Sequence, residues 1–111
     1  MAATALGGMR ILDLTGSNGH YCGRILADFG AEVIKIEPPT GDPTRSIGPF
    51  KDDQPTPETS LYFLNFNTNK KGITVDLSSP SGQATFKRLV QTADAVIESF
   101  HPGTMERWGL D

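Results

Sequence analysis

Two short aliphatic segments, separated by one stretch of helical periodicity, constrain the fold of this chain more than any other feature. Residues 10–14 (Arg-Ile-Leu-Asp-Leu) and 32–36 (Glu-Val-Ile-Lys-Ile) have the length and aliphatic character of buried strands. The large apolar residues between them fall on one face of a helix: Tyr21, Ile25, Leu26 and Phe29. A strand, a helix and a second strand in so short a span predict a parallel βαβ unit with a right-handed crossover.

A second unit of the same kind follows later in the chain. Residues 72–76 and 95–99 read as strands. Between them, Ser79 and Pro80 have the pattern of an N-cap followed by proline at the first helical position. The apolar residues after them again recur at helical spacing: Phe86, Leu89, Val90 and Ala93. A last short helix is expected within residues 101–108.

Residues 37–59 separate the two units and have the composition of a loop, and a short helix is expected over residues 60–66. A loop of this length inside a compact domain is usually functional. The fold class is therefore α/β, a Rossmann-like parallel sheet with flanking helices. Four parallel strands without a closing element look unfinished. Either a small open sheet ends here, or residues 1–111 are one domain from the N-terminal portion of something longer, and we expect the second.

Composition excludes several classes of protein. Apolar residues make up 37% and charged residues 21%, as in ordinary globular domains. Ten Lys and Arg against thirteen Asp and Glu give a net charge of −3, which argues against nucleic-acid binding. The single cysteine cannot form an intramolecular disulfide. No apolar run is long enough to span a membrane, and residues 1–8 lack the pattern of a signal peptide. A cytoplasmic domain is expected.

Ligands of open parallel sheets bind beyond the carboxyl ends of the strands. The first such end carries Gly16, Gly19 and Gly23, and Glu37 ends the second predicted strand. This layout is similar to a dinucleotide site, with glycines near a pyrophosphate and an acid on a ribose. The spacing is not G-x-G-x-x-G, so a second interpretation stands equally: the glycines let helix and strand pack closely.

Most of the other polar residues are expected to have structural roles and not functional ones. Cys22 is expected to be a small buried core residue rather than an activated thiol. Asp13 is expected to be a hydrogen-bonded structural carboxylate. His20 and His101 lack companion ligands, so no metal site is expected, although His20 is a candidate for a polar contact with a ligand. Lys70 and its neighbour Lys71 are expected to be solvated. Two single arginines, Arg45 and Arg107, are candidate phosphate ligands by position.

The order of these segments resembles the opening of the family III CoA-transferases, which include formyl-CoA and carnitine CoA-transferases and α-methylacyl-CoA racemase. The resemblance runs through nearly the whole chain after Gly8. It is carried by residues 10–15, 21–37, 41–45, 62–71, 75–77, 80–82, 93–94 and 98–103. It favours coenzyme A over NAD as the nucleotide.

The resemblance implies that residues 1–111 are an incomplete N-terminal portion of a larger two-domain fold, whose N-terminal domain is a Rossmann-like CoA-binding domain. It also implies that two such subunits interlock as a homodimer. Members of the family transfer CoA between carboxylic acids through an aspartyl intermediate. The resemblance places the nucleophilic Asp downstream of Asp111, so no catalytic residue is expected in this chain. CoA or acyl-CoA is then a substrate, a carboxylic acid is the acceptor, and no permanent cofactor is implied. An acyl-CoA racemase or isomerase and a truncated, non-catalytic CoA-binding module stay open as alternatives.

The resemblance also carries ligand contacts onto individual residues. Val75, Asp76, Leu77 and Ser78 match a loop that lies along CoA, Ser99 and Phe100 match ligand contacts after the fourth strand, and Arg107 matches a phosphate-facing arginine. Asn18 is the best candidate for a polar contact near the thioester. The chain departs from the pattern where it has Ser78 for Lys, Ser99 for Asn, Pro38 for Arg and His20 for Pro, so acyl specificity cannot be transferred.

Overall fold

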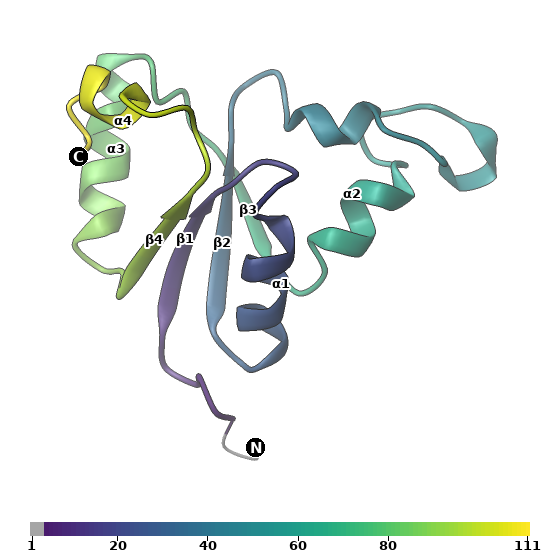
Figure 1. Cartoon of the computed structure of the whole chain (residues 1–111), viewed down its shortest axis with the longest axis horizontal. Helices are drawn as coiled ribbons and strands as arrows, with labels where there is room; N and C mark the ends of the chain where they lie inside the picture. Colours follow the sequence, from purple (N-terminus) through teal and green to yellow (C-terminus); the bar gives the residue numbers. More distant parts are fainter. Residues whose placement is uncertain (1–3) are drawn as a thin grey trace.

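The computed structural model describes residues 4–111, which form a four-stranded parallel sheet with helices on its faces (Figure 1). The spatial order of the strands is β3-β2-β1-β4. The strands are β1 (Arg10–Leu14), β2 (Glu32–Glu37), β3 (Lys71–Thr74) and β4 (Ala95–Glu98). The α-helices are α1 (His20–Asp28), α2 (Leu61–Phe66), α3 (Pro80–Val90) and α4 (Thr104–Arg107), and two 3-10 turns are η1 (Pro43–Ser46) and η2 (Lys51–Asp53).

Strand β1 lies at the centre of the hydrogen-bonded network. Leu12 pairs with Ile34 of β2 on one side and with Val96 of β4 on the other. Because successive side chains of a strand point to opposite faces, even-numbered and odd-numbered residues of β1 enter different cores. The sheet is therefore packed on both faces, as parallel sheets usually are.

The two cores differ in size. On one face, Leu12, Leu14, Ile34 and Ile36 pack with Phe86 of α3 and with residues that follow β3. The other face has a smaller buried cluster, formed by β1, β2 and the α1 region: Ile11, Ala27, Ala31 and Val33. The predicted fold class, an α/β parallel sheet with flanking helices, is confirmed.

The predicted elements are all present, with small shifts at their ends. The third strand begins and ends earlier than predicted, at Lys71–Thr74, and the fourth ends at Glu98. The long loop contains η1 and η2. Ser60 and Ser79 cap α2 and α3, each accepting a backbone hydrogen bond on its side chain. Gly30 and Gly109 end the first and last helices with positive φ, as helix ends often do.

The predicted buried face of α1 was wrong. The residues that α1 buries are His20, Gly23 and Ala27. Tyr21 and Phe29 are more than half exposed, and Ile25 is 37% exposed. The cause is close approach: a side chain at Gly23 would collide with the Asp13 carboxylate, so Gly23 and Ala27 face the sheet below the buried His20. Of the predicted apolar residues, Leu26 alone packs against a core cluster of the described residues.

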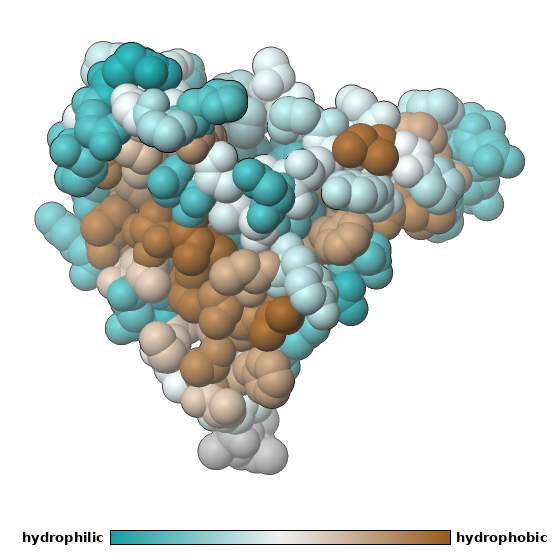
Figure 2. All heavy atoms as spheres, viewed as in Figure 1, coloured by the Kyte–Doolittle hydropathy of each residue, from teal (hydrophilic) through white to brown (hydrophobic). Residues whose placement is uncertain are grey.

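Apolar surface is left open on this side of the molecule. Figure 2 shows apolar side chains gathered across β4, β1 and α1. The exposed large apolar residues of α1 and of the segments beside it are Met9, Tyr21, Ile25 and Phe29. All four residues of β3 are exposed, and β4 is only slightly better covered.

Within residues 4–111, no helix has both the length and the apolar character needed to cross a membrane. The prediction that the chain lacks a signal peptide concerns a segment that begins with residues 1–3, which lie outside the described residues.

We predict that the isolated chain is stable only at its centre. The amides of β1 and β2, each flanked by strands on both sides, should exchange with solvent much more slowly than those of β3 and β4, which are edge strands. Hydrogen exchange on the purified chain, corrected for intrinsic rates, measures this. Strong protection across all four strands in a monomer would contradict the prediction.

Candidate functional site

The candidate site lies at the carboxyl ends of the strands, where the order of the sheet reverses. The chain builds outward from β1 through β2 to β3, then returns to place β4 on the other side of β1. In open parallel sheets, ligands bind in the crevice at such a switch point. Here the switch point lies between the loop that follows β1 and the segment that follows β4, which Figure 1 shows at the same edge of the sheet.

Two adjoining cavities occupy this edge of the sheet. A cavity of about 560 Å³ is lined by the loops after β1 and β4, by Pro38 and by residues 42–44. A neighbouring cavity of about 260 Å³ is lined by the ends of β2 and β3 and by the segment after β4. They share Ile36, Pro38 and Phe100. Another hollow, of about 450 Å³ between residues 40–46 and 50–57, is lined by Arg45 but by none of the residues that the resemblance assigns to CoA contact.

The predicted ligand contacts converge on the two adjoining cavities, with one exception. Asn18, Ser99 and Phe100 line the larger one. The smaller one is lined by Phe100 and by the whole of the predicted loop, which comprises Val75, Asp76, Leu77 and Ser78. Arg107 lies outside both, exposed on α4, where it donates a hydrogen bond to Thr104. Their contact with a ligand stays a prediction.

The loop after β3 is held by its own side chains. Asp76 Oδ1 accepts hydrogen bonds from the backbone N–H of Ser78 at 3.0 Å and from its hydroxyl. Helix α3 packs so closely on this loop that a side chain at Gly82 would overlap the Asp76 carbonyl. Phe100 and Trp108 form an edge-to-face pair at 5.3 Å across the smaller cavity's lining. This cavity therefore combines a fixed polar loop with an aromatic wall.

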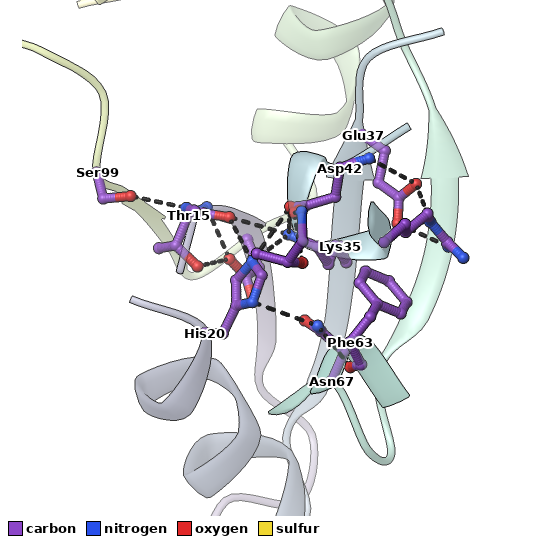
Figure 3. Close-up of polar contacts among 12 residues, drawn as sticks. Thr15, His20, Lys35, Glu37, Asp42, Phe63, Asn67 and Ser99 are labelled. Atoms are coloured by element: carbon purple, nitrogen blue, oxygen red, sulfur yellow. Dashed lines mark hydrogen bonds and ion pairs between the residues drawn. The ribbon is translucent and has the colours of Figure 1, made fainter. Parts of the chain in front are cut away.

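Behind the larger cavity lies a buried polar cluster, which consists of Asp13, His20, Lys35, Asp42 and Lys70. Figure 3 shows three of its members, His20, Lys35 and Asp42, pointing toward one another. The Lys35 ammonium lies 3.0 Å from Asp42 Oδ2, and the Lys70 ammonium lies 2.6 Å from Asp13 Oδ2. The Asp13 side chain is fully buried, and that of Lys70 is 1% exposed. Charges removed from water to this extent require partners of opposite sign. Each of the two pairs joins one ammonium to one carboxylate, so neither leaves a net charge in the interior.

The cluster shifts the pKa of two of its members. Burial alone would raise the pKa of Asp42, but hydrogen bonds from His20 and Thr44 and the nearby Lys35 charge hold it well below its usual range. Burial lowers the pKa of Lys70, and the ion pair with Asp13 offsets part of this shift. Asp42 is therefore firmly ionised in the fold.

A second ion pair occupies two residues that the sequence offered for ligand binding. Arg45 Nη2 donates to Glu37 Oε1 at 2.8 Å, and its Nε donates to Oε2 at 3.0 Å. The hydrogen bonds from Arg45 to Glu37 raise the pKa of the guanidinium. Its Cζ also lies 3.8 Å from the centre of the Phe63 ring. Both charged groups are therefore bound within the protein, which removes the support for Glu37 as a ribose-binding acid and for Arg45 as a free phosphate ligand.

The surroundings of Asp13, Cys22, Lys70 and Lys71 test what the sequence predicted for each of them. Asp13 is a structural carboxylate, as predicted, because it also accepts two hydrogen bonds from Thr15. Cys22 was expected in the core but is exposed, since α1 turns it away from the sheet. Of the two lysines expected to be solvated, Lys71 is exposed, but Lys70 is buried against Asp13.

The glycines after β1 serve packing. A side chain at Gly19 would overlap Thr15, and one at Gly23 would overlap Asp13 and Lys70. Only Gly16 has room around it, with the Ser99 hydroxyl 3.7 Å from the position of an added Cβ. His20 is fully buried at the start of α1, and the described residues contain no group of three or more His, Cys, Asp or Glu side chains placed to hold a metal ion.

The sequence analysis missed the buried polar cluster. Its signal was present in the strands: Asp13 and Lys35 stand in the middle of aliphatic segments, where a charged side chain must find a partner. The partners could not be found in the same way, because Asp42 and Lys70 lie in loop segments that only the folded chain brings back to the sheet.

A sheet of this order with two cavities at its switch point is typical of α/β proteins whose ligands bind at the carboxyl edge of the strands. Comparison with known proteins narrows the class. The family model described as CoA-transferase family III matches residues 6–111. The chain belongs to this family.

Individual relatives agree with the assignment. The chain is 53% identical over 93 residues to succinyl-CoA–D-citramalate CoA-transferase of Chloroflexus aurantiacus, covering 83% of this chain and 22% of the relative. It is 45% identical over 110 residues to formyl-CoA:oxalate CoA-transferase of Afipia carboxidovorans, covering 97% and 25%. A crystal structure of the Mycobacterium tuberculosis protein Rv3272 superposes with a TM-score of 0.86 at 44% identity, covering all of this chain and 30% of that one. The chain thus spans about a quarter of the length of these curated relatives.

We predict that the buried polar cluster makes the fold sensitive to acid. The pKa of Asp42 is lower in the fold than its ordinary value of 3.8, so its contribution to stability is complete above that value and is lost as the pH falls below it. Asp42→Asn should lower the free energy of unfolding at neutral pH by about 3–5 kcal/mol, because it leaves Lys35 buried without its counter-charge.

Urea unfolding at neutral pH and at about pH 3 measures both effects. Asp53→Asn is the matched control, since Asp53 is exposed and has a positive φ that Asn tolerates. Equal stability of the two variants at neutral pH would contradict the prediction.

Proposed function

We propose that residues 1–111 form the N-terminal CoA-binding domain of an acyl-CoA transferase, which moves coenzyme A between carboxylic acids. The observation that carries the proposal is the convergence of residues 75–78 and 99–100 on two adjoining cavities at the switch point of the sheet. Family membership supports CoA transfer as the general chemistry. CoA or acyl-CoA is then a substrate, and the enzyme has no resident cofactor.

The chemistry of the cavities suits a ligand of mixed polarity. CoA combines a flat base, phosphates and a long arm that carries amides. The smaller cavity offers apolar side chains, Val75, Leu77 and the Phe100–Trp108 pair, beside the polar loop of Asp76. The larger cavity offers hydroxyl and amide groups, including those of Ser99 and Asn18. Recognition of an extended ligand along two such cavities needs few charges on the protein.

We propose that the nucleophile is an Asp outside these residues, acting through an aspartyl intermediate. The carboxylates near the cavities support this. Asp13 is fully buried and paired with Lys70. Asp42 is bonded to His20, Lys35 and Thr44. Asp76 is turned onto its own loop by Ser78. Both oxygens of Asp13 and of Asp42 therefore have partners, whereas a carboxylate nucleophile needs a free oxygen against the thioester carbonyl. Asp76 keeps one oxygen without such a partner among the described residues, but the resemblance places it along CoA and not at the acyl carbon.

The second candidate within the family is an acyl-CoA racemase or isomerase, which would use acid and base groups in place of a nucleophile. A non-catalytic CoA-binding module is the third. Sequence encoded after Asp111 separates them, because a downstream Asp is needed for transfer. We further propose that the active protein is a cytoplasmic, interlocked homodimer; its mass in solution tests the dimer.

We predict that the full protein binds CoA more tightly than NAD. The reason is that Glu37, which would hold the NAD ribose, is bound to Arg45, whereas the cavities beside the loop of residues 75–78 are open. Isothermal titration with each nucleotide measures the difference. Tighter binding of NAD would overturn the assignment.

An arginine pair provides the matched control for this titration. Arg107→Ala should weaken CoA binding by about 1.5–3 kcal/mol if its guanidinium makes a charge-assisted bond to a phosphate. Arg88→Ala removes the same charge from the exposed side of α3, outside the lining of both cavities, and should leave CoA binding unchanged.

We predict that residues 1–111 alone have no transferase turnover. The chain should be incubated with an acyl-CoA and an acceptor acid, then treated with hydroxylamine, which converts an aspartyl or glutamyl thioester or anhydride to a hydroxamate. Mass spectrometry should find no hydroxamate on any Asp or Glu of the chain. A hydroxamate together with product would show that the chain contains its own nucleophile. The full protein treated in the same way is the positive control.

A further inference from the structure

We propose that His20 is a positioning residue: together with Lys35 it fixes the peptide between Thr15 and Gly16, and through that peptide it orients the Ser99 hydroxyl toward the larger cavity. The contact of Ser99 with a ligand rests on the proposed function. The fixing of the peptide does not, and it can be measured separately.

The carbonyl of Thr15 receives two donors from the interior of the protein. Lys35 Nζ donates to it at 2.9 Å, and His20 Nε2 lies 3.1 Å from it (Figure 3). The same two nitrogens also contact Asp42 Oδ2, at 3.0 and 3.2 Å. The carbonyl is thus held on the interior side of the peptide by a buried network with balanced charge.

The neighbours of the His20 ring determine which nitrogen carries the proton. Asn67 donates its side-chain amide to the Phe63 carbonyl at 2.9 Å and accepts from Lys70 on its oxygen at 2.8 Å, so its orientation is fixed. That amide nitrogen faces His20 Nδ1 at 3.4 Å, which makes Nδ1 an acceptor. Nε2 faces two oxygens that can only accept, those of Thr15 and Asp42, so it carries the hydrogen and donates toward them. Lys35 Nζ, 3.2 Å from Nε2, directs its own hydrogens to the same two oxygens.

The other side of the same peptide faces the cavity. The Gly16 N–H donates to Ser99 Oγ at 2.7 Å, which joins the loop after β1 to the segment after β4. This bond uses Ser99 as an acceptor, so its own hydroxyl hydrogen stays available to donate. Ser99, Gly16 and Thr15 all line the larger cavity. A peptide is planar, so fixing its carbonyl also fixes the direction of its N–H. The hydroxyl consequently suits an acceptor oxygen of a bound acyl-CoA.

The test compares two polar substitutions of His20 in the full protein. In His20→Gln the side-chain amide reaches the place of Nε2 and can still donate to Thr15. In His20→Asn the amide reaches only the place of Nδ1. Both side chains are small enough for the site and similarly polar, so a purely structural role of His20 would affect the two variants alike.

The first readout is hydrogen exchange at Gly16, with the amides of β1 as the internal reference for global stability. We expect exchange at Gly16 to accelerate about tenfold or more relative to β1 in His20→Asn, and to stay within about twofold of the parent in His20→Gln. Equal acceleration in both variants, no acceleration in either, or a change at Gly16 that only follows β1 would overturn the proposal.

A third variant keeps the proposal falsifiable if the His20 substitutions do not fold. Ser99→Ala removes the acceptor of the Gly16 N–H at a partly exposed position. This substitution should accelerate hydrogen exchange at Gly16 without affecting the amides of β1. It should also shift the ¹⁵N resonance of His20 Nε2, because the Thr15–Gly16 peptide links Ser99 to that nitrogen. An unchanged Nε2 resonance would overturn the linkage.

The second readout is CoA affinity. His20→Asn should weaken CoA binding about fivefold or more, His20→Gln should restore most of it, and Ser99→Ala should add little to His20→Asn, because both act on one element. Additive losses would overturn the coupling. If the full protein bound no CoA at all, the proposed function would fail, while the exchange measurement would still decide whether His20 fixes the peptide.

Discussion

Two buried ion pairs on one face of the sheet govern much of this structure. The Asp13–Lys70 and Lys35–Asp42 pairs place two carboxylates and two ammonium groups in an interior with almost no contact with water. Loss of any one member would leave an uncompensated buried charge, which is far costlier than loss of a surface pair. Asp13 belongs to β1 and Lys35 to β2, whereas Asp42 precedes η1 and Lys70 directly precedes β3. The two pairs therefore fasten both ends of the long connection between β2 and β3 to the central strands.

The same pairs decide how α1 lies on the sheet. The Asp13 carboxylate and the Lys70 stem occupy the space directly beneath Gly23, so the helix can approach the sheet at this point only with a glycine. The sequence analysis predicted both strands and the helix from their periodicity, because that information is local. It predicted the wrong face of the helix, because apolar periodicity does not reveal that a buried ion pair takes the place of large side chains. Tyr21 and Phe29 remain on the open surface as a result.

The candidate site shows a similar division between what local sequence reveals and what it does not. Residues that directly follow strands, such as Val75 and Ser99, could be placed at the sheet edge from the strand assignments alone. Their meeting in two adjoining cavities follows from parallel topology. The roles of His20 and Lys70 could not be predicted, since each depends on residues more than fifteen positions away that only the fold brings near. The sequence did signal a buried polar cluster, through the charged residues Asp13 and Lys35 inside aliphatic strands, but it did not indicate which residues join them.

Thr15 is where the buried polar cluster and the cavity meet. Its N–H and hydroxyl donate to Asp13, its carbonyl accepts from Lys35, and the next N–H donates to Ser99. Every polar group at this point of the backbone has a partner of its own, so the start of the loop is fixed from the interior and does not depend on a ligand. Asn18, two residues after Gly16, is exposed. A substitution at Asn18 therefore alters the lining of the larger cavity without disturbing the backbone that carries it, so the shape of the cavity can vary while the buried polar cluster stays the same.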